Sequence, residues 1–151
     1  MTKIDIKSGL AAFFTQDHRD CDSRWADVEE LLDTEDVETA RGAWEKFNAS
    51  TRRHLDMEEQ VLFPALDARS GKDAGGHIAM MKTEHQQMLG LLDQIGQAMD
   101  AGDAQEALDI GDTLLILIQQ HNVKEEGMLY PLAQNMLADE WETIAAELDK
   151  Y

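Results

Sequence analysis

Four of the five histidines recur at identical spacing in the two halves of the chain. When the sequence is shifted by 67 residues, the residues that fall on residues of the same type include His18 on His85, His54 on His121, Glu58 on Glu125, Glu59 on Glu126, Leu62 on Leu129 and Pro64 on Pro131. Each half therefore reads as an acidic residue and a histidine, followed later by His-x3-Glu-Glu-x2-Leu-(Phe/Tyr)-Pro. This internal repeat indicates two equivalent halves that contribute the same chemical groups.

The repeated side chains have the types and spacing of metal ligands. On a helix, His54 and Glu58 point the same way, as do His121 and Glu125, because residues four apart are one turn apart. A single His-x3-Glu pair is commonly just a surface pair, but two pairs in register are not explained that way. Four imidazoles and two carboxylates inside a bundle need partners, and a shared metal site provides them.

The ligand count indicates two metal ions rather than one. Four histidines and two carboxylates exceed the needs of one tetrahedral zinc ion, and they suit two six-coordinate transition ions bridged by carboxylates. Two iron ions are favoured, with manganese or zinc able to substitute. A lone Cys21 excludes a zinc site built from several thiolates. The order His-x3-Glu also differs from the Glu-x2-His pattern of ferritin-type centres.

The apolar residues predict the helices that must position these ligands. They recur at helical spacing throughout the chain, which favours an all-α fold. We expect a single domain over residues 1–151, an up-down-up-down antiparallel four-helix bundle with a short C-terminal helix. The expected helices span about 8–33, 36–68, 76–100, 104–131 and 138–150. Pro64 is expected to bend or end the second helix, and the fourth to end near Pro131.

Two residues near the histidines are candidates for a ligand pocket. Phe14 and Met81 each lie one turn before the first histidine of their half. Both could line the pocket through which a small diatomic ligand approaches, or they could be ordinary core residues. Cys21 is expected to be a small buried core residue, and His77 a surface or capping residue.

Four further acidic residues lie next to the predicted ligands in the sequence. Glu59 and Glu126 are expected to face solvent or to orient imidazoles. Asp17 and Glu84, which directly precede histidines, are expected to face partly outward.

Composition excludes several classes of partner. Thirteen basic against 31 acidic residues give a net charge of −18, so no uniform basic face is available for phosphates. We expect no nucleic acid partner and no membrane partner. The longest aliphatic run, residues 114–118, is too short to span a bilayer, and residues 1–7 lack the apolar core of a signal peptide. A cytoplasmic location follows, while the oligomeric state stays open.

Over residues 8–132 the chain resembles hemerythrin-like proteins. The residues that carry the resemblance are His18, the run HLDMEEQVLFP at 54–64, His85, and the run HNVKEEGMLYP at 121–131. The resemblance implies a non-haem di-iron centre in which two histidine pairs each bind one iron and two glutamates bridge them. The pairs would be His18 with His54 and His85 with His121, and the bridges Glu58 and Glu125.

Two departures separate the chain from oxygen-carrying hemerythrins. Met81 stands where those proteins have another histidine. Their acidic bridge lies five residues after the histidine of the fourth helix, whereas the repeat favours Glu125, four residues after His121, with Glu126 as the fallback ligand. The ligand set is closer to that of di-iron proteins associated with repair of iron–sulfur centres and with nitric oxide and peroxide stress. Those proteins usually carry an additional N-terminal cysteine-containing domain, which this sequence lacks.

Several functions are compatible with this ligand set. The resemblance implies a protein that binds or reacts with O2, peroxide or nitric oxide at two iron ions, which take a bridged diferric form once oxidised. The alternative is a non-catalytic iron-binding sensor or iron-handling protein whose bundle is stabilised by metal. The third hypothesis is a purely structural bundle whose histidines are satisfied by hydrogen bonds. Whether the protein is an enzyme depends on the surroundings of the metal, which the ligands alone do not define.

Overall fold

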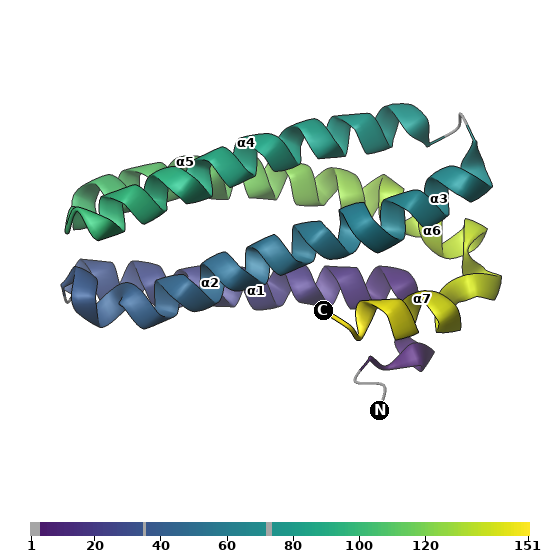
Figure 1. The fold of residues 1–151 in the computed structure, drawn as a ribbon, viewed down its shortest axis with the longest axis horizontal. Coiled ribbons are helices and arrows are strands. Elements are labelled where there is room, and N and C mark those ends of the chain that lie inside the picture. Colours follow the sequence, from purple (N-terminus) through teal and green to yellow (C-terminus); the bar gives the residue numbers. More distant parts are fainter. Residues whose placement is uncertain (1–3, 35, 72–73) are drawn as a thin grey trace.

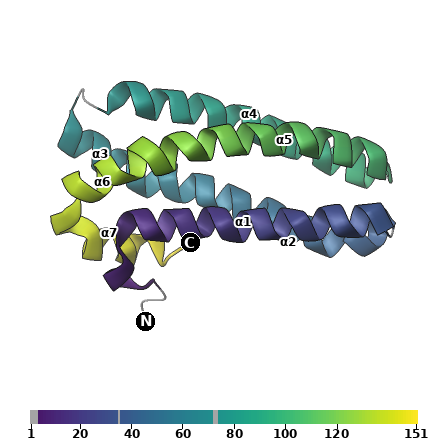
Figure 2. The ribbon, with the colours of Figure 1, turned by 180° about the vertical axis from the view of Figure 1, so that it is seen from behind.

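Two antiparallel helical hairpins make up the body of the molecule. In the computed structural model, which describes residues 4–34, 36–71 and 74–151, α1 (Gly9–Thr34) pairs with α2 (Val37–Met57), and α4 (Gly75–Asp100) pairs with α5 (Ala104–Lys124). The hairpins lie one above the other as two layers (Figure 1), and the view from behind shows the same arrangement (Figure 2). No strand occurs in the described ranges, so the predicted all-α bundle is confirmed.

Aspartate caps begin the second helix of each hairpin. The Asp36 side chain accepts a hydrogen bond from the Thr39 amide at 2.9 Å, and Asp103 accepts one from the Glu106 amide at 3.0 Å. Such caps satisfy amides that have no partner within the helix. Gly102, with φ at 72°, provides the left-handed residue that ends α4 and turns the chain into α5. The sequence thus sets both hairpin turns locally.

The second helix of each hairpin widens into a π-helical turn at the glutamate that the sequence predicts as a ligand. These turns are η2 (Glu58–Leu62) and η3 (Glu125–Leu129). The amide of Phe63 donates to the carbonyl of Glu58, five residues back, and Tyr130 does the same to Glu125. Because a π turn holds one extra residue, the helix after it is rotated relative to the helix before it.

The prolines do not end the helices, contrary to the sequence prediction for the fourth helix. Chain segments α3 (Phe63–Ser70) and α6 (Tyr130–Met136) continue directly from the π turns, so the fourth rod extends past Pro131. Each proline lies in the first turn of its new α segment, where its missing N–H is tolerated. Pro64 in the same way follows a π turn instead of breaking the second helix.

The hydrophobic core is divided into two clusters along the bundle. One cluster gathers residues of α3, α6 and α7 (Trp141–Leu148) around the start of α1, and includes Phe14, Met81 and Tyr130. The other fills the end where the hairpins turn, and includes Trp25 and Phe47. The short C-terminal helix α7 is tied to the N-terminal segment, because the Trp141 indole donates to the Ile6 carbonyl at 2.9 Å. The polar residues of the repeat lie between the two clusters.

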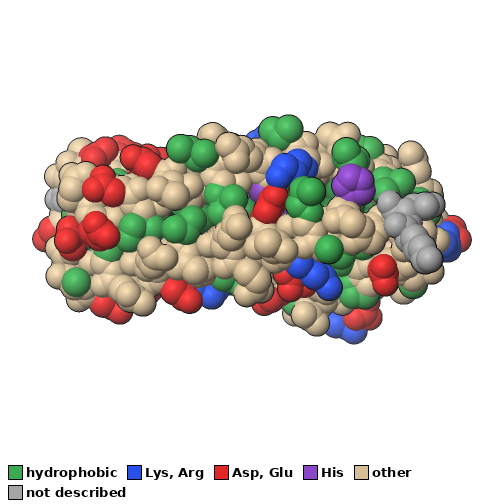
Figure 3. Space-filling model, turned by 90° about the horizontal axis from the view of Figure 1, so that it is seen from above, with side chains coloured by type: hydrophobic (Ala, Val, Ile, Leu, Met, Phe, Trp, Pro, Cys, Tyr) green, Lys and Arg blue, Asp and Glu red, His purple; other side chains and the backbone are tan. Residues whose placement is uncertain are grey.

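Charge is unevenly spread over the outer face of α4 and α5. Acidic side chains gather at the end where these two helices turn, and the middle of the face is largely uncharged (Figure 3). None of the described helices has the length and apolar character needed to cross a membrane.

Candidate metal centre

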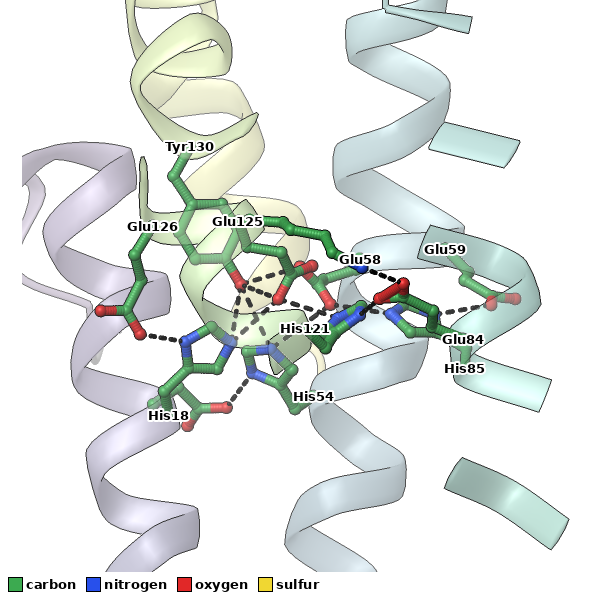
Figure 4. A network of polar contacts seen from close by, with 12 residues as sticks. His18, His54, Glu58, Glu59, Glu84, His85, His121, Glu125, Glu126 and Tyr130 are labelled. Carbon is green, nitrogen blue, oxygen red and sulfur yellow. Dashed lines mark hydrogen bonds and ion pairs between the residues drawn. The ribbon is translucent and has the colours of Figure 1, made fainter. Parts of the chain in front are cut away.

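The six predicted ligands meet in the middle of the bundle and are all buried. Their exposed fractions run from 0% for Glu58, His85 and Glu125 to 5% for His54. Each of the four long helical rods supplies one histidine, and the two π turns supply the glutamates. Figure 4 shows the imidazole rings converging on the two carboxylates from both sides. An apolar core is thus interrupted by one polar layer.

Each glutamate lies between histidines of the two different hairpins. Glu58 Oε1 is 3.4 Å from His54 Nε2 and 3.3 Å from His85 Nε2. Glu125 Oε1 is 3.0 Å from Nε2 of both His18 and His121. A carboxylate between two imidazoles from opposite hairpins has the position of a bridging ligand.

The unsatisfied atoms of this layer fit metal ions. Among the described residues, seven buried side-chain polar atoms have no hydrogen-bond partner, and four of them lie here. They are Glu58 Oε1, His85 Nε2, His121 Nε2 and Glu125 Oε2, whose close contacts are not aligned as hydrogen bonds. Ligand atoms within 4.8 Å of one another form two overlapping groups: Glu58, His85, His121 and Glu125 in one, and His18, His54 and Glu125 in the other. This donor set suits two ions that share a carboxylate.

A comparison with protein families agrees with this geometry. The sequence model of the hemerythrin HHE cation-binding domain matches residues 10–133. The chain belongs to the hemerythrin HHE family. No curated protein and no solved structure gave a match. The match spans both halves of the repeat, and the predicted family resemblance is confirmed.

In this hemerythrin domain, a carboxylate holds the outer nitrogen of each of the four imidazoles predicted to bind metal. The Nδ1 atoms lie 2.7 to 3.0 Å from the oxygens, in the pairs Asp17 with His54, Glu84 with His121, Glu59 with His85 and Glu126 with His18. All four pairs obey the 67-residue repeat. An Nδ1–H that donates outward leaves the Nε2 lone pair facing the metal, which fixes the tautomer that a ligand needs.

Three of these carboxylates also bind a basic side chain. Arg53 contacts Asp17 at 3.1 Å, Lys124 contacts Glu84 at 2.6 Å and Arg19 contacts Glu126 at 2.9 Å. Burial raises the pKa of each carboxyl, but its hydrogen bonds and the neighbouring positive charges lower the pKa more, so each lies below its usual value. These acids are therefore ionised while they hold the imidazoles.

Two of the acidic residues are placed differently from the sequence prediction. Asp17 and Glu84 were expected to face partly outward, but they are 6% and 9% exposed and turn toward the neighbouring helix. Each precedes a histidine yet binds the histidine of another helix, because consecutive residues on a helix point in different directions. The expectation that Glu59 and Glu126 orient imidazoles agrees with the structure.

Tyr130 reaches the ligand set from one side only. Its hydroxyl lies 2.8 Å from Glu58 Oε2 and 3.0 Å from Glu125 Oε1, and 3.0 Å from His18 Nε2. The equivalent residue of the first half, Phe63, has no hydroxyl and stacks on His85 with ring centroids 5.7 Å apart. The two candidate metal positions therefore have different neighbours. Tyr130 was not predicted as a site residue, although the Phe-to-Tyr difference between the two halves of the repeat distinguishes it.

The buried setting keeps two of the histidines neutral. Burial lowers the pKa of His18 and of His121 to about 4, with further lowering from the neighbouring His54 and His85 respectively. Burial also lowers the pKa of His54, but the charge of Glu58 and the hydrogen bond to Asp17 outweigh it and raise the pKa to about 9. Protons therefore compete little with metal at His18 and His121.

The carboxyl pair and Tyr130 are shifted by their mutual contact. Burial and the charge of Glu58 raise the pKa of Glu125. Burial opposes ionisation of Glu58 as well, but His54 and the hydrogen bond to Glu125 lower its pKa below the usual value. Burial and both carboxyl groups raise the pKa of Tyr130, so its hydroxyl keeps its proton.

The remaining candidate residues lie outside the ligand set. Phe14 and Met81 are buried in the cluster on the Tyr130 side, where Phe14 stacks on Tyr130 with ring centroids 5.2 Å apart. Cys21 is half-buried one turn after His18, and His77 is half-buried in the first turn of α4.

Proposed function

We propose that this hemerythrin domain holds two iron ions and that it binds or reacts with dioxygen, peroxide or nitric oxide there. The single observation that carries the proposal is the pair of ligand groups that share Glu125. One ion would be held by His18 and His54, and the other by His85 and His121. Glu58 and Glu125 would bridge them, each lying between one histidine of each pair.

The chemistry of the donor atoms supports iron. Nitrogen and oxygen ligands without thiolate suit iron and manganese, and zinc can occupy the same atoms. Two ferrous ions, when bound, would supply electrons to a small oxidant. The proposal extends to a cytoplasmic location and a role in oxidative or nitric oxide stress.

The protein's own residues prepare the site for such a reaction. The four outer carboxylates fix the imidazoles, and the hydrophobic clusters on both sides exclude bulk water. Tyr130 holds a proton within 3.0 Å of oxygens of both bridging carboxylates. A proton donor at this position can neutralise negative charge that develops on a small reduced ligand.

Metal content and an optical spectrum test the proposal. The protein loaded with ferrous iron without air should contain two iron ions per chain and gain near-ultraviolet and visible absorption on exposure to air. His54→Ala should abolish the absorption. His77→Ala is the matched control, because it removes the histidine outside the ligand set and should leave the spectrum unchanged. Colourless protein that holds zinc alone after iron-rich expression would contradict the proposal.

The same samples distinguish the alternative function. An iron-binding sensor or iron-handling protein would show iron-dependent changes of melting temperature or oligomeric state without consuming peroxide, dioxygen or nitric oxide. Steady turnover of any of the three excludes a purely non-catalytic role.

A further inference from the structure

The outer face of the second hairpin lacks charge along most of its length. Over residues 113–123, α5 contains no Asp, Glu, Lys or Arg, and over residues 86–97, α4 contains only Asp93. Asp93 pairs with Arg52 of α2 at 2.6 Å, so its charge lies toward the first hairpin. Between the acidic end and the central blue and red side chains, this stretch is tan and green (Figure 3). We call its exposed residues, Asp93 excepted, the neutral face.

The repeat provides an internal comparison for this face. An open groove runs between the two helices of each hairpin. Three positions line both grooves, and each pairs a charged residue of the first half with an uncharged one of the second: Arg24 with Leu91, Asp27 with Gln94 and Lys46 with Thr113. The first hairpin forms with charges at these positions. The hairpin fold therefore does not require the neutral face, and another cause must be sought.

Exposed apolar side chains are also concentrated on the second hairpin. Ile116 and Val123 of α5 are 58% and 71% exposed. Met80 of α4 and Met128 of η3 are exposed as well, whereas no large hydrophobic residue of α1 or α2 is. The centres of protein interfaces are depleted of charged residues, and exposed apolar groups without charges between them are typical of such a surface.

Gly90 leaves a hollow in the neutral face. It lines the groove together with Ile116. A Cβ at Gly90 would meet no other part of the described chain within 4 Å, and its φ lies outside the left-handed region. Glycine destabilises a helix interior, and nothing within the molecule requires it here. The space is open to a side chain from a second molecule.

The charge of the chain determines which partner this face suits. Two copies that each carry a net charge of −18 repel one another, so they approach most easily through a face without charge. A basic partner would instead be attracted to the acidic end of the hairpin (Figure 3). Glutamine amides both donate and accept hydrogen bonds, so a face that exposes Gln87, Gln94 and Gln120 can pair with a copy of itself.

We propose that the neutral face of α4 and α5 binds a second copy of this chain and forms a two-fold symmetric dimer. In such a dimer the same residues meet from both sides, and Ile116 of each copy enters the groove beside Gly90 of the other. The inference does not depend on which metal the centre holds. The face is about 15 Å long and about 20 Å wide, which is small for an interface, so we expect a Kd on the micromolar scale.

Sedimentation velocity of the zinc-loaded protein over a range of concentrations tests the dimer. We expect a shift from monomer to dimer between about 1 and 100 μM. Salt should strengthen the dimer, because it screens the repulsion between two acidic chains and leaves the neutral contacts unaffected. A protein that stays monomeric up to about 100 μM at about 0.5 M salt would overturn the proposal, as would a dimer that salt weakens.

Two variants at equivalent positions of the repeat locate the interface. Ile116→Glu should raise the dimer Kd at least about tenfold, because symmetry places two unpaired carboxylates in the contact. Ala49→Glu adds the same charge at the equivalent exposed position of α2 and should leave the Kd within about twofold. Equal effects would show that net charge alone matters and would contradict the proposed face. Circular dichroism checks that both variants keep their helices, and Gln120→Glu, which changes the shape least, should also weaken the dimer.

The glycines of the two grooves provide a second matched pair. Gly90→Ala fills the hollow and should weaken the dimer, while it raises the melting temperature measured below the Kd, because alanine favours helix. Gly42→Ala adds the same methyl group in the groove of the first hairpin, where it also meets nothing within 4 Å, and should raise the melting temperature without changing the dimer Kd. A dimer that tolerates both Gly90→Ala and Ile116→Glu would form through another face and would overturn the inference.

Discussion

At the residue scale, the outer carboxylates decide how strongly the imidazoles hold metal. Asp17 binds Nδ1 of His54 at 2.7 Å, and Asp17→Asn would keep an acceptor there while removing its charge. A neutral partner makes the imidazole a weaker ligand, so we expect the affinity for iron or zinc to fall about tenfold to hundredfold. Competition with a chelator of known affinity measures this change.

The control for this variant lies on the same helix. Asp20→Asn removes an equal charge from the exposed face of α1, where Asp20 contacts Gln16 instead of a histidine. Its effect on metal affinity should be small, because exposed charges are screened by water and salt. Equal losses in the two variants would show that net charge, and not the contact with His54, determines the affinity.

Tyr130 offers a second prediction at this scale. In the metal-free protein, Tyr130→Phe removes a hydrogen-bond donor from two buried carboxylates, which should lower the free energy of unfolding by about 1–3 kcal/mol. The loss should be smaller with zinc bound, because the metal then satisfies those oxygens. Urea unfolding of both forms measures the difference. Tyr151→Phe, at a residue that is 46% exposed, is the control. Identical losses with and without metal would contradict the expected contact.

Most of the candidate ligands could be predicted because the same pattern of histidine and glutamate occurs in both halves of the sequence. Chance rarely places histidine and glutamate at the same spacing in both halves, so the repeat indicated His54 and His121 together as candidate metal ligands. Asp17 was harder to place, since its partner is 37 residues away on another helix and nothing local indicates the contact. Tyr130 could not be predicted from the repeat, because the hydroxyl that contacts the carboxylates is absent from its counterpart Phe63.

At the scale of elements, the π turns set the direction of Glu58 and Glu125 and of the residue five positions after each. Both turns begin at a predicted glutamate ligand, and the amide after each turn donates a hydrogen bond to that glutamate's carbonyl. Because of the extra residue, each histidine and glutamate of a His-x3-Glu pair face the middle of the bundle, while the α segment that follows still buries its apolar side. Apolar spacing predicted the long rods well. It did not predict the π turns, because one inserted residue changes the spacing by less than one turn.

Removing the extra residue of one π turn should separate helix formation from metal binding. Deleting Gly127, which is exposed and has open space around it, should return η3 to ordinary α-helical bonding. All later residues of the rod would then rotate by about 100°, which carries Tyr130 away from the carboxylates. We expect circular dichroism to show retained helix, with a lower melting temperature and fewer than two metal ions per chain.

The matched variant at this position is Gly127→Ala. It keeps the number of residues, and alanine favours helix by up to about 1 kcal/mol over glycine. The substituted protein should keep its metal and melt at the same temperature or slightly higher. A deletion variant that still binds two metal ions with a wild-type spectrum would show that the π turn is dispensable.

At the scale of the whole molecule, the polar layer holds two hairpins together. The first hairpin supplies His18 and His54, the second supplies His85 and His121, and the glutamates span the gap between them. Without metal, this layer puts unsatisfied atoms in the middle of the core of a chain whose net charge is −18. Two divalent ions would satisfy those atoms and change the net charge to −14, which is −18 + 4. Metal binding and the packing of the hairpins should therefore be coupled.

This coupling predicts a metal-dependent melting temperature. A ligand present at 100 times its Kd stabilises the folded state by about 3 kcal/mol per site, which for a domain of this size raises Tm by roughly 5–10 °C. Zinc serves as the test metal because it avoids oxidation during heating. His121→Ala should lose most of the shift, since it removes a predicted ligand and the contact of α5 with Glu84 of α4. His77→Ala should keep the full shift. If zinc leaves Tm unchanged in the wild type, the layer is satisfied by its own hydrogen bonds, and the hairpins pack independently of metal.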